Sequence, residues 1–420
     1  LRVREGFAVV AFGWLVVGLL GAVPGWLSGQ MPSFTDAAFE SISGFSTTGA
    51  SILTDIESRT HGTLFWRALT HWLGGMGIVL LAVAILPLLG VGGMQLYRAE
   101  VPGPVAERLT PRIRETAKRL WGVYVLLTVL EVAALMIAGL GPFDAICHAF
   151  ATMATGGFSN HNASVGGYGL PAVEWIIIVF MFLAGTNFSL HYLALTGHWK
   201  AYPHDEEFRF YGSIILVAAL LIGGALFLAG TFEQAGETVR ATLFQVVAII
   251  TTTGFGTEDY LLWPPIAHAV LLALMAVGGC AGSTGGGIKV MRVFILLRHA
   301  KIELKKMLHP RGVFTLWFND RAVSPGLQTN VLGFFLLFVV VYVLGVVILT
   351  LGGRDLLTSI GATAATLGNI GPGLGQVGPA SNYAFFGIWE KWLLVLFMLI
   401  GRLELFTVLV LFLPGAWRRS

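Results

Sequence analysis

Four glycine-bearing segments recur roughly every hundred residues and carry the clearest chemistry of the sequence. Their sequences are SGFSTTGAS (43–51), MATGGFSNH (153–161), IITTTGFGT (249–257) and TLGNIGPGLG (366–375). Glycine adopts backbone dihedrals that β-carbons resist, so it allows successive carbonyl groups to face one common axis. Rings of such carbonyls can replace the hydration shell of a cation. The pattern therefore predicts a binding site for a dehydrated monovalent cation, most simply K⁺.

The candidate ligands are each aligned glycine and the two residues before it. They are Thr47, Thr48, Gly49, Thr155, Gly156, Gly157, Thr252, Thr253, Gly254, Asn369, Ile370 and Gly371. None of these residues is a carboxylate, which disfavours a ring for divalent cations. The Thr-Thr-Gly triplets of the first and third segments fit the carbonyl-ring interpretation best, and the other two fit it more loosely.

Each glycine segment occupies the same place in a repeated pattern of apolar runs. A long apolar span precedes it, then a stretch too short to cross a membrane, and a second long span follows. In the first repeat the span, short helix, loop and second span are predicted at 8–27, 34–46, 47–51 and 65–89, and in the second repeat at 120–140, 143–155, 156–160 and 172–196. In the third repeat they are predicted at 211–230, 238–251, 252–256 and 262–297, and in the fourth at 330–351, 355–368, 369–373 and 384–414. We therefore expect an all-α polytopic membrane protein whose four tandem helix–pore loop–helix repeats surround a central pore, as in K⁺ channels.

The repeats divide the whole chain. Their expected bounds are 1–95, 96–200, 201–310 (with a broken second helix) and 311–420. The alternative is a set of eight or twelve ordinary helices joined by glycine-rich connectors. That alternative does not account for the short apolar segment before each loop, and backbone that leaves helical geometry at membrane depth must be buried or line water.

Composition and charge support a membrane protein with a defined orientation. Apolar residues make up 55% of the 420 residues, mean hydropathy is +0.78 and charged residues are only 12%, which excludes an ordinary soluble domain. Basic residues concentrate in 96–119 and 289–311, whereas the alternate loops hold one arginine, Arg59, and no lysine. This asymmetry predicts that both termini and the basic loops are cytoplasmic. It also gives no exposed basic face for nucleic acid.

A glycine-rich interruption breaks the second span of the third repeat. It comprises Gly278, Gly279, Cys280, Ala281, Gly282, Ser283, Thr284, Gly285, Gly286 and Gly287. Six glycines in ten residues disfavour a helix, and irregular backbone at this depth must face protein or water. We interpret the segment as a gating loop below the filter; the alternative is a flexible packing kink.

Several polar residues lie within or beside apolar spans. Arg402 is expected either to face the conduction path and hold the gating loop shut, or to form a structural pair with Glu404 or Glu131, or to snorkel. Lys289 either supports the gating loop or marks the cytoplasmic end. Glu131, Asn187 and His191 are expected to be interhelical hydrogen-bonding groups, and Asp36 and Asp144 to cap their short helices.

The chain resembles the Trk/Ktr/HKT superfamily of potassium transporters (the TrkH/KtrB transporters), and its TrkH branch most closely. The matching segments are LRVREGF (1–7), HWLGGMGI (71–78), AILPLLGVGGMQLYRAEVPGP (84–104), GGCAGSTGGGIKV (278–290), NIGPGLG (369–375) and GRLELFT (401–407). The resemblance implies K⁺ uptake across the bacterial inner membrane, with coordination by carbonyls beside Gly49, Gly157, Gly254 and Gly371. A serine at the first of these positions accompanies Na⁺ permeation in the wider superfamily, so Gly49 favours K⁺. Two helices precede the first repeat in full-length TrkH-branch members, and the resemblance implies that this chain begins after them.

The resemblance also implies a homodimer with one pore per subunit, and a cytosolic nucleotide-binding regulatory ring (TrkA-like) that meets the basic loop at 298–311. We expect no enzyme and no cofactor, because H-E-x-x-H, G-x-S-x-G and the P-loop pattern are all missing from the sequence. Cys147 and Cys280 lie in apolar or glycine-rich surroundings, which disfavours a disulfide or a cysteine metal site. The competing function is a secondary K⁺ symporter coupled to H⁺ or Na⁺. Such folds usually have inverted repeats, whereas these repeats are parallel and only one helix is predicted to be broken.

Overall fold

The protein is built almost entirely of helices, and the computed structural model describes residues 3–84 and 109–413. The first half contains α1 (Val3–Leu27), α2 (Phe34–Phe45), α3 (His61–Ala84), α5 (Leu109–Ile137), α6 (Pro142–Met153), η1 (Ser164–Tyr168), α7 (Pro171–Ala184), α8 (Phe188–Leu195) and α9 (Ala201–His204). The second half contains α10 (Glu206–Ala229), α11 (Ala235–Ile250), η2 (Tyr260–Leu262), α12 (Pro265–Val277), α13 (Val290–Leu308), α14 (Pro325–Leu351), α15 (Leu356–Leu367), η3 (Gly375–Val377), α16 (Ile388–Arg402), α17 (Leu405–Leu409) and η4 (Val410–Phe412). The only strands in the described residues are β1 (Trp317–Phe318) and β2 (Arg321–Ala322), which pair antiparallel as a small hairpin.

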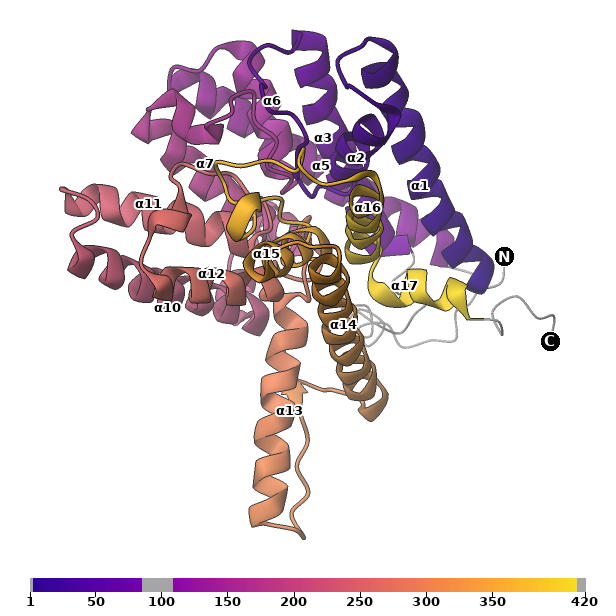
Figure 1. Cartoon of the computed structure of the whole chain (residues 1–420). Coiled ribbons are helices and arrows are strands. Elements are labelled where there is room, and N and C mark those ends of the chain that lie inside the picture. The colour runs from indigo at the N-terminus through magenta and orange to yellow at the C-terminus, as the bar shows by residue number, and fades with distance from the viewer. Residues whose placement is uncertain (1–2, 85–108, 414–420) are drawn as a thin grey trace.

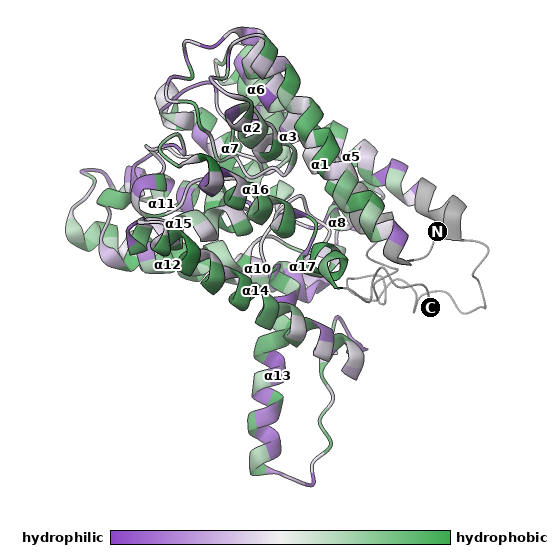
Figure 2. Ribbon diagram, turned by 45° about the vertical axis from the view of Figure 1, so that its right-hand side comes forward, coloured by the Kyte–Doolittle hydropathy of each residue, from purple (hydrophilic) through white to green (hydrophobic). Residues whose placement is uncertain are grey.

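Four helices in the described residues are each long and apolar enough to cross a membrane. They are the segments Glu5–Leu27 of α1, Glu115–Ile137 of α5, Glu206–Ala229 (α10) and Pro325–Leu351 (α14). Two bent pairs, α7 with α8 and α16 with the α17–η4 segment, raise the number to six if each pair is one span. The green surfaces of α1 and α14 in Figure 2 show how strongly apolar these helices are. The prediction of a multi-pass, all-helical membrane protein is confirmed at this level.

Each of the helices α2, α6, α11 and α15 packs against both the helix before it and the helix after it. In the first unit, α2 contacts both α1 and α3, and in the last unit α15 contacts both α14 and α16. These helices are largely buried, and in α2 every residue from Asp36 to Phe45 is buried. We call these four elements the pore helices, after the role that the sequence pattern predicts for them. Figure 1 shows α16 beside the indigo α2, and these two helices contact each other, so the end of the chain packs beside its beginning.

The expectation of one broken helix is wrong. The second span of the second repeat bends by 100° between α7 and α8, and that of the fourth bends by 118° after Arg402. The first bend has a clear cause, because the carbonyls of Ala184 and Gly185 accept hydrogen bonds from the 278–287 segment instead of from the next helical turn. At the second bend Glu404 has a φ of +62°, and its carboxylate pairs with Arg292 at 2.6 Å.

The helix α13 projects away from the bundle, as both views show (Figures 1 and 2). Its surface is mixed purple and green, unlike the uniformly apolar spans. The basic residues in 96–108, which are predicted to be cytoplasmic, lie outside the described residues. Most of the matching segment 84–104 also lies outside them.

Candidate functional site

The four candidate loops meet in one closed ring. A Cβ placed on Gly49 would collide with the carbonyl oxygen of Gly156 in the second loop. In the same way Gly157 abuts the oxygen of Thr253, and Gly254 abuts that of Ile370. The ring closes because a Cβ on Gly371 would lie 2.7 Å from the oxygen of Thr48 in the first loop. At each of these positions the next loop approaches so closely that no β-carbon fits, so glycine is required.

The loops also share one backbone conformation, although their side chains differ. We call residues 47–49, 155–157, 252–254 and 369–371 the four loop triplets. Their first residues have φ of 51°, 54°, 60° and 54°, and their final glycines have φ of 77°, 81°, 77° and 95°. The middle residue is not in the positive-φ region in any triplet. Such alternation turns successive carbonyls toward the same side, the arrangement that a carbonyl-lined cation site requires.

Burial is graded along the triplets. The threonines at 47, 48, 155, 252 and 253 and Asn369 are almost fully buried. The final glycines of the first three triplets are partly exposed, whereas Gly371 is buried. The pore helices end next to these triplets, and the C-terminal end of a helix carries partial negative charge that favours a nearby cation.

A side-chain hydrogen bond joins the first and fourth triplets and occupies the Thr48 hydroxyl. The Thr48 hydroxyl lies 2.7 Å from that of Ser46 and accepts a 2.9 Å hydrogen bond from the Asn369 side-chain amide. The same amide nitrogen also donates to the Met398 carbonyl at 2.9 Å. Asn369 therefore joins the fourth triplet to the first and to α16, a role that a third Thr-Thr-Gly could not perform.

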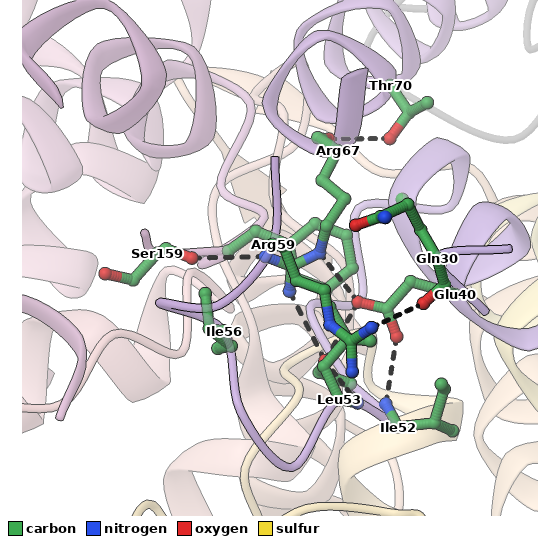
Figure 3. A network of polar contacts seen from close by, with 12 residues as sticks. Gln30, Glu40, Ile52, Leu53, Ile56, Arg59, Arg67, Thr70 and Ser159 are labelled. Atoms are coloured by element: carbon green, nitrogen blue, oxygen red, sulfur yellow. Dashed lines mark hydrogen bonds and ion pairs between the residues drawn. The ribbon is translucent and has the colours of Figure 1, made fainter. Parts of the chain in front are cut away.

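A buried ion pair binds main-chain groups just after the first and second loop triplets (Figure 3). Arg67 of α3 and Glu40 of α2 pair at 2.8 Å, with side chains only 3% exposed. The other oxygen of Glu40 accepts from the Ile52 N–H at 2.9 Å. Arg67 also donates to the Ser159 carbonyl at 3.2 Å, and its guanidinium lies 4.1 Å from the centre of the Phe158 ring.

A polar contact also joins each remaining repeat to the next. The second is joined to the third by Glu174 of α7 and Arg240 of α11 at 2.8 Å. The third is joined to the fourth by the Tyr260 hydroxyl, which donates to the Gly373 carbonyl at 2.7 Å. The fourth is joined to the first by Lys391 and Asp36 at 2.6 Å. We call these contacts, with Arg67–Ser159, the inter-repeat links.

Sequence reasoning missed these supporting residues. The available signal was a charged residue inside a short apolar helix, such as Glu40, which is costly at membrane depth unless it has a partner. Asp36 was interpreted as a helix cap, but the cap of α2 is Ser33, whose hydroxyl accepts from the Asp36 N–H at 3.1 Å. Asp144 likewise is not the cap of α6, which is Gly141; its carboxylate accepts from the Asn160 amide at 2.7 Å.

The glycine segment 278–287 lies directly against the ring. The Gly286 N–H donates to the Thr252 hydroxyl at 2.7 Å, and a Cβ on Gly286 would collide with the Gly368 carbonyl. The Thr284 hydroxyl donates to the carbonyl of Met153, at the end of α6, at 3.0 Å. Three of the four repeats thus contact the segment at the level of the pore-helix ends.

Two basic side chains hold the segment from the other side. Arg402 is 2% exposed, and it donates to the Thr284 carbonyl at 2.7 Å and to the Gly74 carbonyl at 3.1 Å. Its side chain pairs with neither Glu404 nor Glu131; Glu404 instead pairs with Arg292. Lys289 donates to the Gly285 carbonyl at 3.0 Å, so it supports the segment.

The remaining predicted polar residues differ in outcome. Both carboxylate oxygens of Glu131 are buried without a hydrogen-bond partner in the described part of the chain, so the expectation of an interhelical hydrogen bond is wrong for Glu131. His191 contacts the Tyr202 hydroxyl at 2.5 Å and the Leu183 carbonyl at 2.9 Å, as expected of an interhelical group. Asn187 caps α8 by accepting from the Ser189 N–H. Cys147 and Cys280 are free and buried, and among the described residues no cluster of three His, Cys, Asp or Glu side chains could hold a metal ion.

Comparisons with known proteins agree with this architecture. The family described as "TrkH: Cation transport protein" matches residues 1–226 and 230–417. The Trk system potassium uptake protein TrkH of Salmonella typhimurium is 44% identical over 422 residues, covering 100% of this chain and 87% of the relative. The Trk system potassium uptake protein TrkG of Escherichia coli is 35% identical, covering 100% of this chain and 86% of the relative.

A solved structure is similar throughout. The crystal structure of the potassium transporter TrkH from Vibrio parahaemolyticus superposes with a TM-score of 0.91 at 41% identity, covering 99% of this chain and 86% of that chain. The resemblance identified from the sequence is therefore confirmed.

Proposed function

The chain belongs to the TrkH family of cation transport proteins, and from this premise we propose that it takes up potassium across the bacterial inner membrane through a selectivity filter formed by the four loop triplets. The observation that carries the proposal is the closed contact of Gly49, Gly157, Gly254 and Gly371 with successive loops. Backbone oxygens from four corners of one chain supply ligands for a dehydrated monovalent ion. Potassium is the ion named for the relatives.

The glycine segment and Arg402 act as the gate in this proposal. Two hydrogen bonds from a buried guanidinium, to Thr284 in the segment and to Gly74 in α3, support a closed position against the first repeat. Opening requires the segment to leave the axis, so the bonds of Gly286 to Thr252 and of Thr284 to Met153 must break. Glycine gives the segment the backbone freedom for this movement.

Assembly and regulation are part of the same proposal. We place a homodimer in the membrane with both termini cytoplasmic, one pore per subunit, and a nucleotide-binding TrkA-like ring at the end of α13. Lys301 and Lys305 of α13, and Arg311 just beyond its end, support this docking region because all three are exposed and α13 projects from the bundle (Figure 1).

The test measures potassium efflux from vesicles that contain the purified protein and no other ion gradient. Gly254→Ala places a methyl group against the Ile370 carbonyl and should reduce potassium flux to the level of empty vesicles. Gly224→Ala is the matched control because its site on α10 is open, and it should leave flux unchanged. Full potassium flux through Gly254→Ala would contradict the filter assignment, and flux that requires a gradient of H⁺ or Na⁺ would favour the symporter.

A further inference from the structure

One carboxylate holds both the glycine segment and the start of the helix that follows it. Glu207, the second residue of α10, is 4% exposed. Its Oε1 atom accepts a 2.7 Å hydrogen bond from the Ala281 N–H and a 3.1 Å hydrogen bond from the Met291 N–H. Ala281 lies near the start of the segment, and Met291 is the second residue of α13. The glycine segment and the start of α13 are therefore bound to the same oxygen atom.

These bonds restrain the segment in a way that Arg402 does not. Arg402 binds the Thr284 carbonyl in the second half of the segment, whereas Glu207 binds the Ala281 N–H in the first half and the Met291 N–H at the start of α13. A buried main-chain N–H group that loses its acceptor costs free energy, so both donors favour contact with this oxygen. A movement of the segment that carries Ala281 away from α10 must break such a bond.

The neighbouring residues connect this anchor to α13. Glu206 pairs with Arg298 of α13 through both carboxylate oxygens, at 2.9 and 3.2 Å. It also accepts from the Asn319 N–H at 3.0 Å, in the turn of the β1–β2 hairpin, and Asp205 accepts from the Asn319 side chain at 2.8 Å. The acidic turn 205–207 thus contacts the glycine segment, α13 and the hairpin.

We propose that Glu207 is a positioning residue that latches the glycine segment in its closed position, and that the acidic turn 205–207 transmits displacement of α13 to this latch. The inference rests on the proposed gate. The helix α13 begins shortly after the segment and projects from the bundle (Figure 1). A displacement of its far end therefore moves Arg298 and the paired Glu206 before it moves the segment. Tilting α13 would then draw Met291 away from Glu207 and release the latch.

The first experiment compares potassium efflux from vesicles that contain full-length protein. Glu207→Ala removes the acceptor and should raise potassium flux at least about tenfold without changing the ratio of potassium to sodium flux. Glu207→Gln retains an acceptor oxygen at the same place and should restore most of the closed behaviour. Glu303→Ala is the control, because the Glu303 side chain on α13 is 46% exposed, and it should leave flux unchanged.

A second measurement does not depend on transport. Cys280 lies within the segment, and the chain's other cysteine, Cys147, lies in the pore helix α6; both are 1% exposed. In Glu207→Ala the reaction of Cys280 with a small maleimide should accelerate about tenfold, while that of Cys147 should stay as slow as in the wild type. Equal acceleration at both cysteines would mean general loosening of the fold and would overturn the latch.

Parallel measurement of Arg402→Ala separates the latch from the gate. Raised flux in Arg402→Ala with wild-type flux and wild-type Cys280 reactivity in Glu207→Ala would overturn the latch and leave the gate intact. Wild-type flux in both variants would overturn the proposed gate itself. Raised flux in Glu207→Ala accompanied by lost ion selectivity would also overturn the latch, because a positioning residue of the gate leaves the filter unchanged.

Discussion

At the scale of single residues, the site depends on backbone shape more than on side-chain identity. Asn369-Ile370-Gly371 has little in common with Thr47-Thr48-Gly49 in sequence, yet both triplets begin with φ near +50° and end on a glycine in the positive-φ region. The first position of each triplet holds a residue with a β-carbon in a left-handed conformation, which is uncommon and marks a constrained functional backbone. The glycine at the third position is set by contact with the next loop.

Replacing Gly49 by serine tests this residue-scale account. The serine β-carbon would collide with the Gly156 carbonyl, and the residue would have a disfavoured φ of +77°. The first two loops must therefore separate. We expect the ratio of potassium to sodium flux to fall about tenfold or more, which corresponds to roughly 1.4 kcal/mol. Isotope flux in vesicles measures the ratio, and Gly122→Ser on α5, where the space is open, is the control.

The glycine positions were predictable because they recur with one spacing beside the same apolar pattern. The residues behind the ring were not, because no local periodicity connects their partners. Lys391 and Asp36 are 355 residues apart, and each alone has several ordinary interpretations. The sequence pattern also predicted a helix cap at Asp36, where the structure has an ion pair across the first and last repeats.

At the scale of elements, the pore helices are held by the inter-repeat links as well as by apolar packing. In two links, Glu174–Arg240 and Lys391–Asp36, a charged residue near the start of a helix after one loop reaches the pore helix of the next repeat. The Lys391–Asp36 link matters most for closure because it joins the two ends of the tandem array.

Breaking the Lys391–Asp36 pair should destabilise the protein. Lys391→Ala leaves the largely buried Asp36 carboxylate without its cation, and removing one partner of a buried pair costs about 3–5 kcal/mol. The free energy of unfolding in mixed detergent micelles measures the loss. The exchange Asp36→Lys with Lys391→Asp should recover part of it.

Lys306→Ala provides the matched control, because the Lys306–Glu303 pair lies on the surface of α13 with side chains 47% and 46% exposed. Such exposed pairs add little to stability, so this variant should unfold like the wild type. Equal stability of Lys391→Ala and Lys306→Ala would show that the link between the fourth and first repeats does not hold the array closed.

Element boundaries show where sequence patterns stop being informative. The pore helices begin and end within a few residues of their predicted bounds, because each is bounded by turn residues and a polar loop. The bend at 185–187 was not predicted, since its cause is the distant glycine segment: the Cys280 N–H donates to the Gly185 carbonyl at 2.9 Å. Gly185 and Asn187 alone do not distinguish a bend from a continuous span.

At the scale of the whole molecule, the account predicts which surfaces face each side of the membrane. Leu262 in the loop after the third triplet is 83% exposed, and Val313 beyond α13 is 95% exposed. In intact cells, a membrane-impermeant maleimide should label Leu262→Cys but not Val313→Cys, and permeabilised cells should show both. Labelling of Val313→Cys from outside would reverse the proposed orientation.

The most direct test of the central claim is the reversal potential of purified protein in a planar bilayer, with a potassium gradient opposed by proton and sodium gradients. A carbonyl-lined, uncoupled potassium filter predicts a current that reverses close to the potassium equilibrium potential and does not shift when the proton or sodium gradient is changed. A reversal potential that follows either of those gradients, or a current that vanishes without them, would contradict the account.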